Sequence, residues 1–228
     1  MNALQMQIEF ERLLYTSNPD FSNSDKLDTE EIFAYLNISQ LRVMKAKYFP
    51  TSDILENVRI IQSNIEELRN LIKRDTRTIE NSIDTLYGYL VSFPTDYLHY
   101  IRSDSVVTRT TIFPMTSQVV PNKIIDYSNV DSIVTNTFNN PIIRKPCIVF
   151  EEDDNMVIFR DKYTSFDGDL YLTYLRTPID IALGGSNDCE LADYLHEEIV
   201  ATAVDIFRRE KYLLNTKQEV KDDTSRNA

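Results

Sequence analysis

The chain has 228 residues, a mass of 26.6 kDa, a formal net charge of −12 and 42% apolar residues, which predicts one domain, or one domain with an attached subdomain. The negative net charge argues against a protein that wraps nucleic acid, because phosphate binding needs a concentration of Lys and Arg. It is compatible with a channel surface along which DNA slides, since like charges keep DNA from adhering. Short apolar runs exclude a membrane-spanning helix, and MNALQMQIEF lacks the pattern of a signal peptide, so we expect the chain to fold in the cytoplasm.

The first predicted helix follows the polar stretch SNPDFSNSDKLD. Apolar residues recur at helical spacing from Ile32 to Tyr48, and Asp28 or Thr29 stands at the position of an N-cap. Pro50 follows, and proline disfavours helical geometry in the residue before it. The pattern therefore predicts a helix that ends before Pro50.

Two further helices are expected in the first half of the chain. One begins at a cap within residues 51–53, carries a stripe of i, i+3, i+4 and i+7 type, and ends near Arg74. The other is shorter and uses the apolar positions of residues 79–94. Three helices in series predict an N-terminal helical bundle over residues 1–94.

From Tyr97 the period of the pattern changes to two. The segment YLHYIRSDSVVTRTTIF alternates and is rich in Val, Thr, Ile and Tyr, which is typical of a half-buried strand or hairpin. Further strands are expected at residues 147–151, 156–160 and 170–176. A turn around Asp167, Gly168 and Asp169 would join the last two. The strands predict an antiparallel β insertion over residues 95–180.

The clearest helix is predicted after Pro178. Its apolar face begins at Leu191, its first turn is acidic and its last turn is basic, so the charges at both ends match the helix dipole. We assign residues 181–213 to a C-terminal helix that completes the bundle. The expected fold class is α+β, a helical bundle of three N-terminal helices and a C-terminal helix with an inserted antiparallel β subdomain.

Two segments show no regular period. Residues 114–146 are rich in Pro and Asn and predict a long, partly irregular loop of the kind that often binds a partner. Residues 214–228 have almost no apolar side chains and predict a mobile polar tail unless a partner orders it.

Motifs for catalysis or metal binding are few, and we expect no catalytic residues, cofactor or metal. His196 begins the sequence HEE, which lacks the second histidine of a zinc motif, so a solvated helix face is the favoured interpretation. The acidic run 151–154 lacks the ligand spacing of a calcium loop and is interpreted as a solvated hairpin turn. Cys147 and Cys189 lie far apart and predict two reduced thiols.

Candidate functional residues are therefore interface residues. Aromatic side chains in polar or loop-like contexts are candidates for contacts with a partner, although core packing is the alternative for any one of them. The candidate set, with two charged residues of the tail, is Tyr15, Phe21, Phe49, Phe113, Phe138, Lys217 and Arg226.

The chain resembles the neck adaptor or head–tail connector proteins of tailed bacteriophages, closest to those of crAss-like, short-tailed phages. The resemblance covers most of the chain and rests on LNISQLRVMKAKYF, FPTDYLHYIR, and LTYLRTPIDIAL followed by ELADYLHEEIVATAVDIFRREK. The shared features are an Asn-x-x-Gln pattern at Asn37 and Gln40, a Pro-Asp-Tyr-like start of the β insertion at Pro94, Asp96 and Tyr97, and a strand that feeds a closing helix.

The resemblance implies a non-enzymatic virion protein of the phage neck. It implies a homo-oligomeric ring of about twelve copies that joins the portal to the tail or to further neck rings, and through which DNA passes without specific binding. Portal and other neck or tail proteins are the implied partners, with no membrane. Two alternatives stay open: another tail or capsid-associated subunit of different symmetry, and a metal-dependent enzyme that uses His196, Glu197 and Glu198.

Overall fold

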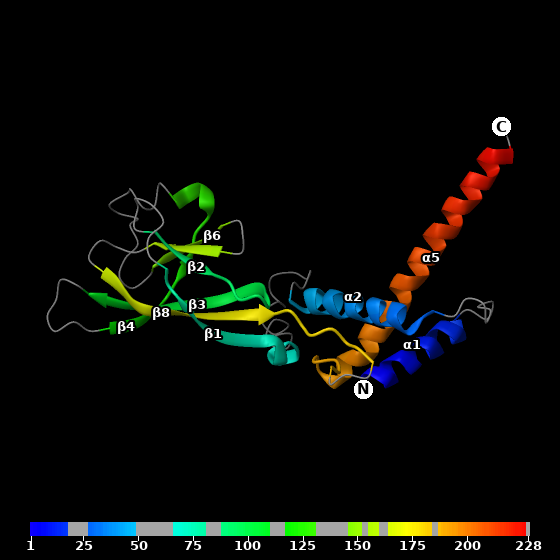
Figure 1. Ribbon diagram of the computed structural model, residues 1–228, viewed down its shortest axis with the longest axis horizontal. Coiled ribbons are helices and arrows are strands. Elements are labelled where there is room, and N and C mark those ends of the chain that lie inside the picture. The colour runs from blue at the N-terminus through cyan, green and yellow to red at the C-terminus, as the bar shows by residue number, and fades with distance from the viewer. Residues whose placement is uncertain are drawn as a thin grey trace, which may run out of the picture. The chain divides into compact units, whose positions relative to one another are not determined.

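The computed structural model describes residues 1–17, 27–48, 66–80, 88–109, 117–130, 146–151, 155–159, 164–183 and 187–226. Within these residues the chain has mixed α and β structure, with three α-helices and two four-stranded sheets (Figure 1). The chain divides into a helical unit, Met1–Leu71 with Pro178–Ala228, and a β unit, Ile72–Thr177. The β unit is thus an insertion into the helical unit.

α1 (Ala3–Ser17) packs against the N-terminal half of α5 (His196–Arg226). Its buried residues Met6, Phe10 and Leu14 recur every four positions and form one face of the helix. The Phe10 ring meets Phe207 edge-on, with ring centroids 6.5 Å apart. No helix is predicted here from the sequence, although the apolar residues of both faces recur at helical spacing.

α2 (Thr29–Tyr48) confirms the first predicted helix. It runs in the opposite direction to α5: Lys47 near its end pairs with Glu198 at 3.2 Å, and the Tyr35 hydroxyl nearer its start donates to Glu210 at 2.8 Å. Figure 1 shows α1 and α2 beside the N-terminal half of α5, whose last turns extend beyond them.

The second predicted helix ends earlier than expected, and the third is wrong where the structure describes it. Residues 51–65 lie outside the described residues, and Glu66 and Glu67 are helical. The chain then forms a 3-10 turn, η2 (Arg69–Leu71), and becomes a strand at Ile72 rather than staying helical to Arg74. Residues 88–92, assigned to the third helix, are also a strand. Both strands exist because they pair with strands far along the chain, which local periodicity cannot show. The predicted helical bundle is therefore not confirmed.

The β unit contains two sheets. Sheet A has the order β1 (Ile72–Thr78), β8 (Thr164–Arg176), β3 (Tyr97–Arg109), β4 (Ser117–Pro121), and its neighbours are antiparallel. Sheet B has the order β2 (Gly88–Ser92), β7 (Asn155–Phe159), β6 (Cys147–Glu151), β5 (Lys123–Ile124), with β5 parallel to β6. β3, β6 and β7 begin within one residue of their predicted starts.

The core of the β unit contains side chains from both sheets. Val91, Ile148, Met156 and Ile158 of sheet B and Leu170, Leu172 and Tyr174 of sheet A form one buried cluster. Gly88 of β2 lies close to the side chains of the neighbouring strand β7, because a Cβ at this position would lie 3.0 Å from Val157 Cγ1. This close approach gives Gly88 a packing role in a strand.

Three further expectations need correction. The turn predicted at Asp167–Asp169 is instead a bulge within β8, where Gly168 has a φ of 92° and the pairing with β3 shifts register. The 114–146 segment contains β4, β5 and a short 3-10 helix, η3 (Tyr127–Asn129), while its residues 131–145 lie outside the described residues. α5 begins only at His196, after η4 (Asp193–Leu195), and its backbone stays helical to Arg226, beyond the predicted end at residue 213.

Candidate functional site

Asn37 and Gln40 of α2 hold the backbone of the segment that follows Pro178. The Asn37 side chain accepts a hydrogen bond from the Ile181 N–H at 2.8 Å and donates one to the Ile181 carbonyl at 3.3 Å. Gln40 donates to the Ile179 carbonyl, also at 3.3 Å. A side-chain amide carries the donor and acceptor of a peptide group, so Asn37 replaces a neighbouring strand for this buried backbone. The Asn-x-x-Gln pattern therefore fixes the segment that leads into the last helix.

Asp96 ties together three strands of sheet A at the end where the chain enters and leaves the β unit. Its carboxylate accepts from the Tyr174 hydroxyl of β8 at 2.7 Å and from Lys73 of β1 at 3.0 Å, and its carbonyl accepts from the Thr177 N–H at 2.8 Å. Burial alone would raise the pKa of Asp96, but the hydrogen bonds from Tyr174 and Lys73 hold that pKa below its ordinary value. Tyr97, which follows in the motif, stacks on Phe93 with ring centroids 4.0 Å apart.

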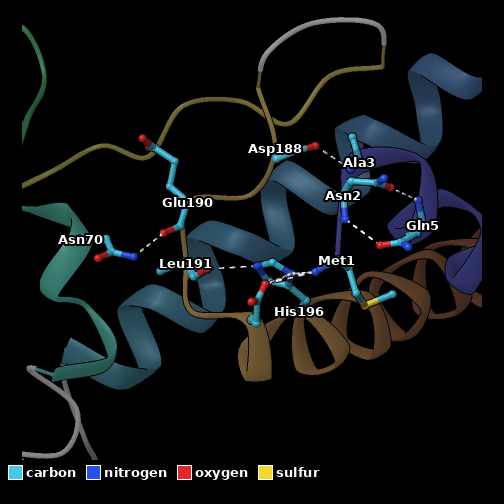
Figure 2. A network of polar contacts seen from close by, with 10 residues as sticks. Met1, Asn2, Ala3, Gln5, Asn70, Asp188, Glu190, Leu191 and His196 are labelled. Carbon is cyan, nitrogen blue, oxygen red and sulfur yellow. Dashed lines mark hydrogen bonds and ion pairs between the residues drawn. The ribbon is translucent and has the colours of Figure 1, made fainter.

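A polar network joins the start of α1 to the residues before α5 (Figure 2). Asn2 and Gln5 exchange two backbone-to-side-chain hydrogen bonds, the pattern of a capping box, and Asp188 accepts from the Ala3 N–H at 2.9 Å. Across the same region Asn70 donates to the Glu190 carbonyl at 3.1 Å. These contacts satisfy backbone groups that a helix start and an irregular segment leave unpaired.

His196 is buried in this network, so its predicted place on a solvated helix face is wrong. Its ring is 2% exposed, with Nε2 at 3.0 Å from the Leu191 carbonyl and Nδ1 at 2.7 Å from the Met1 amine. The adjacent Glu197 and Glu198 are exposed, and Glu198 pairs with Lys47 of α2 at 3.2 Å. A buried imidazole with both nitrogens in hydrogen-bonding contact is placed to support the fold and is poorly placed to reach a dissolved substrate.

Of the predicted interface residues, the structure describes the side chain of Tyr15 alone. Tyr15 is 40% exposed and lies on the same face of α1 as Leu4 and Ile8, which are 51% and 56% exposed. Phe21, Phe49, Phe113 and Phe138 lie outside the described residues. Lys217 and Arg226 are in the helical backbone of α5, while their side chains lie outside the described part of the chain.

Sequence reasoning missed Leu4, Ile8 and also Ile38, an exposed apolar residue of α2. The spacing of Leu4, Ile8 and Tyr15 was a usable signal, because it defines one helical face distinct from that of Met6, Phe10 and Leu14. Ile38 gave no such signal, since it is a single apolar residue off the buried face.

Other chemistry finds little support in the described residues. No three His, Cys, Asp or Glu side chains lie together as metal ligands there, and the acidic residues 152–154 are outside the described ranges. Cys147 and Cys189 are both buried, and burial raises the pKa of each thiol. In the same part of the chain no helix is long and apolar enough to cross a membrane.

Comparison with known proteins adds no assignment: the chain matches no protein-family model, and a search of the curated proteins gives no significant match.

Proposed function

We propose that this chain is a structural virion protein of a tailed bacteriophage, a neck adaptor that forms a ring of about twelve copies between the portal and the tail or further neck rings. DNA passes through the ring during ejection without specific binding. The chain would be made in the host cytoplasm and would act in the virion.

The main support for this proposal is the role that residues of the Asn-x-x-Gln and Pro-Asp-Tyr patterns have in the structure. Asn37, Gln40 and Asp96 use their polar groups to hold the chain's own backbone and strands together. A set of polar residues used in this way builds a rigid scaffold and leaves none of them available as nucleophile or base. Polar side chains that brace the unit in which they lie suit a subunit whose task is attachment.

The charge distribution adds support. The helical unit has 13 Lys and Arg against 22 Asp and Glu, and the β unit has 11 against 14, so their net charges are −9 and −3. Like charge keeps a polyanion from adhering to a wall. An acidic subunit is therefore compatible with a channel that DNA traverses.

The test is the solution mass by light scattering, first for the full chain and then for the chain mixed with the portal from the same genome. A ring of twelve 26.6 kDa copies has a mass of about 320 kDa. That mass, or a portal-dependent shift to a fixed stoichiometry, would support the neck ring. A monomer that does not respond to the portal would instead favour another tail or capsid-associated subunit.

A further inference from the structure

The outer face of α2 carries a stripe with opposite charges at its two ends. Glu31, Ala34, Ile38, Arg42 and Lys45 are all exposed and recur at intervals of three and four residues, so they lie on one helical face. Ile38, 43% exposed, lies near the middle of the stripe, between the acidic and basic ends. We call this set the α2 stripe.

α5 carries a second stripe of the same kind. Glu198, Ala201, Asp205 and Arg209 are exposed at intervals of three and four residues, and we call this set the α5 stripe. It too is acidic at its N-terminal end and basic at its C-terminal end. Its second position is a small residue, Ala201, which lets another helix approach closely.

The two stripes lie on opposite sides of the helical unit. α2 and α5 pack together through their buried faces, and the Lys47–Glu198 and Tyr35–Glu210 contacts show that they run in opposite directions. Each stripe lies opposite the buried face of its own helix, except that Glu198, at the N-terminal end of the α5 stripe, is close enough to α2 to pair with Lys47. The rest of the α5 stripe, Ala201, Asp205 and Arg209, therefore lies on the side away from the α2 stripe. A subunit that closes a ring needs such a pair of surfaces on different sides, because each contact in a ring is heterologous.

The charges of the two stripes match in spacing. Glu31 and Arg42 are eleven positions apart, as are Glu198 and Arg209, which is about 16 Å along a helix. If the two stripes meet in opposite directions, Glu31 lies opposite Arg209 while Arg42 lies opposite Glu198. Ile38 then lies opposite Thr202, one position from the small side chain of Ala201.

We infer that the α2 stripe of one copy binds the α5 stripe of the next copy, an inference that rests on the proposed ring function and names its intersubunit contact. Exposed ion pairs contribute little affinity but set orientation and register, so the charges select this arrangement among those that cover Ile38. The rest of the ring contact must come from other surfaces.

The α2 stripe also allows a different pairing, with a second α2 around a two-fold axis at Ile38. Glu31 would then lie opposite Lys45, and the product would be a closed dimer with no role for Arg209. The presence of a matched second stripe on α5 favours the heterologous contact. The two arrangements differ in which charge reversals affect assembly.

The experiment uses the full-length variants Glu31→Arg and Arg209→Glu, with the portal present if the unaltered chain needs it to assemble. Each variant alone should lose the ring, with the mass falling from about 320 kDa toward the 26.6 kDa monomer, because like charges then meet at every contact. An equimolar mixture should restore the ring, since alternating copies again bring opposite charges together. The double variant should also restore it.

The matched control is Glu30→Arg, which makes the same charge change at an exposed position next to the stripe. It should assemble like the unaltered chain, and thermal unfolding should show that all variants fold. If both single variants assemble normally, the contact is wrong while the ring stands. If Glu31→Arg abolishes a dimer that Arg209→Glu leaves intact, the two-fold pairing replaces our inference. A chain that is monomeric with and without the portal overturns both this contact and the proposed function.

Discussion

Asn37 and Ile181 are joined by two hydrogen bonds across 144 positions of sequence. Ile181 is 1% exposed, so its backbone depends on the Asn37 side chain for the partners that water would otherwise supply. The pair links α2 to the segment that leads into α5.

Asn37→Ala should destabilise the helical unit by about 1–3 kcal/mol, because it leaves a buried N–H and carbonyl unpaired. Chemical denaturation followed by circular dichroism measures the change. Glu30→Ala, at an exposed position of the same helix outside the α2 stripe, is the control and should change the free energy of unfolding by less than about 0.5 kcal/mol. Equal effects of the two substitutions would contradict the role of Asn37.

Asp96→Asn should lower the stability of the β unit at pH 7 by about 1–2 kcal/mol, because it weakens the charge-assisted bonds to Lys73 and Tyr174. The pKa of Asp96 lies below its ordinary value of 3.8, so the carboxylate stabilises fully above that value and loses its effect as the pH falls through the lowered pKa. The gap between the unaltered chain and the variant should therefore narrow below about pH 4. Denaturation midpoints between pH 7 and 2 measure the gap.

The control for the acid titration is Asp169→Asn, at an exposed position of the same unit. Its denaturation midpoint at pH 7 should be close to that of the unaltered chain. A gap for Asp96→Asn that stays constant to pH 2 would show that the carboxylate charge of Asp96 does not matter.

His196→Ala should destabilise the helical unit by about 2–3 kcal/mol, since it opens a cavity and leaves the Leu191 carbonyl without its side-chain partner. Glu197→Ala changes the neighbouring, exposed residue and should have little effect. Thermal unfolding distinguishes the two variants. Had His196 been a solvated side chain, its substitution would be as mild as that of Glu197.

Asn122→Ala should destabilise the β unit by about 2–4 kcal/mol. The Asn122 amide donates to Ser103 and accepts from Ser105, each at 2.8 Å, and both serines are fully buried. Removing it leaves two buried hydroxyls short of a partner. Gln118→Ala, exposed on the neighbouring strand β4, is the matched control for urea denaturation.

Deletion of residues 215–228 should leave the monomer folded and weaken its association with the portal. The deletion removes the last turns of α5, and an isolated helical segment of this length has little stability of its own in water. Circular dichroism checks the fold, and light scattering with the portal checks docking. Normal association of the truncated chain would exclude a docking role for Lys217 and Arg226.

The sequence alone was sufficient for elements whose pattern is local. α2 was predicted because its apolar residues follow one helical period between a cap and a proline, and β6 and β7 because their apolar runs are short and β-branched. The residues of the Asn-x-x-Gln and Pro-Asp-Tyr patterns were also identified from sequence, although their partners were not.

Tertiary structure decided the elements whose stability comes from distant partners. The residues of β1 and β2 have a sequence pattern that fits a helix at least as well as a strand. They form strands because β1 pairs with β8 and β2 pairs with β7, which supply their hydrogen bonds. His196 is buried because the residues around Met1 and Leu191 close over it, although its own sequence context is polar. The periodicity of a sequence shows which face of a helix or strand is apolar. Strand pairing and the burial of polar residues depend instead on which distant parts of the chain come together, and a local pattern does not contain that information.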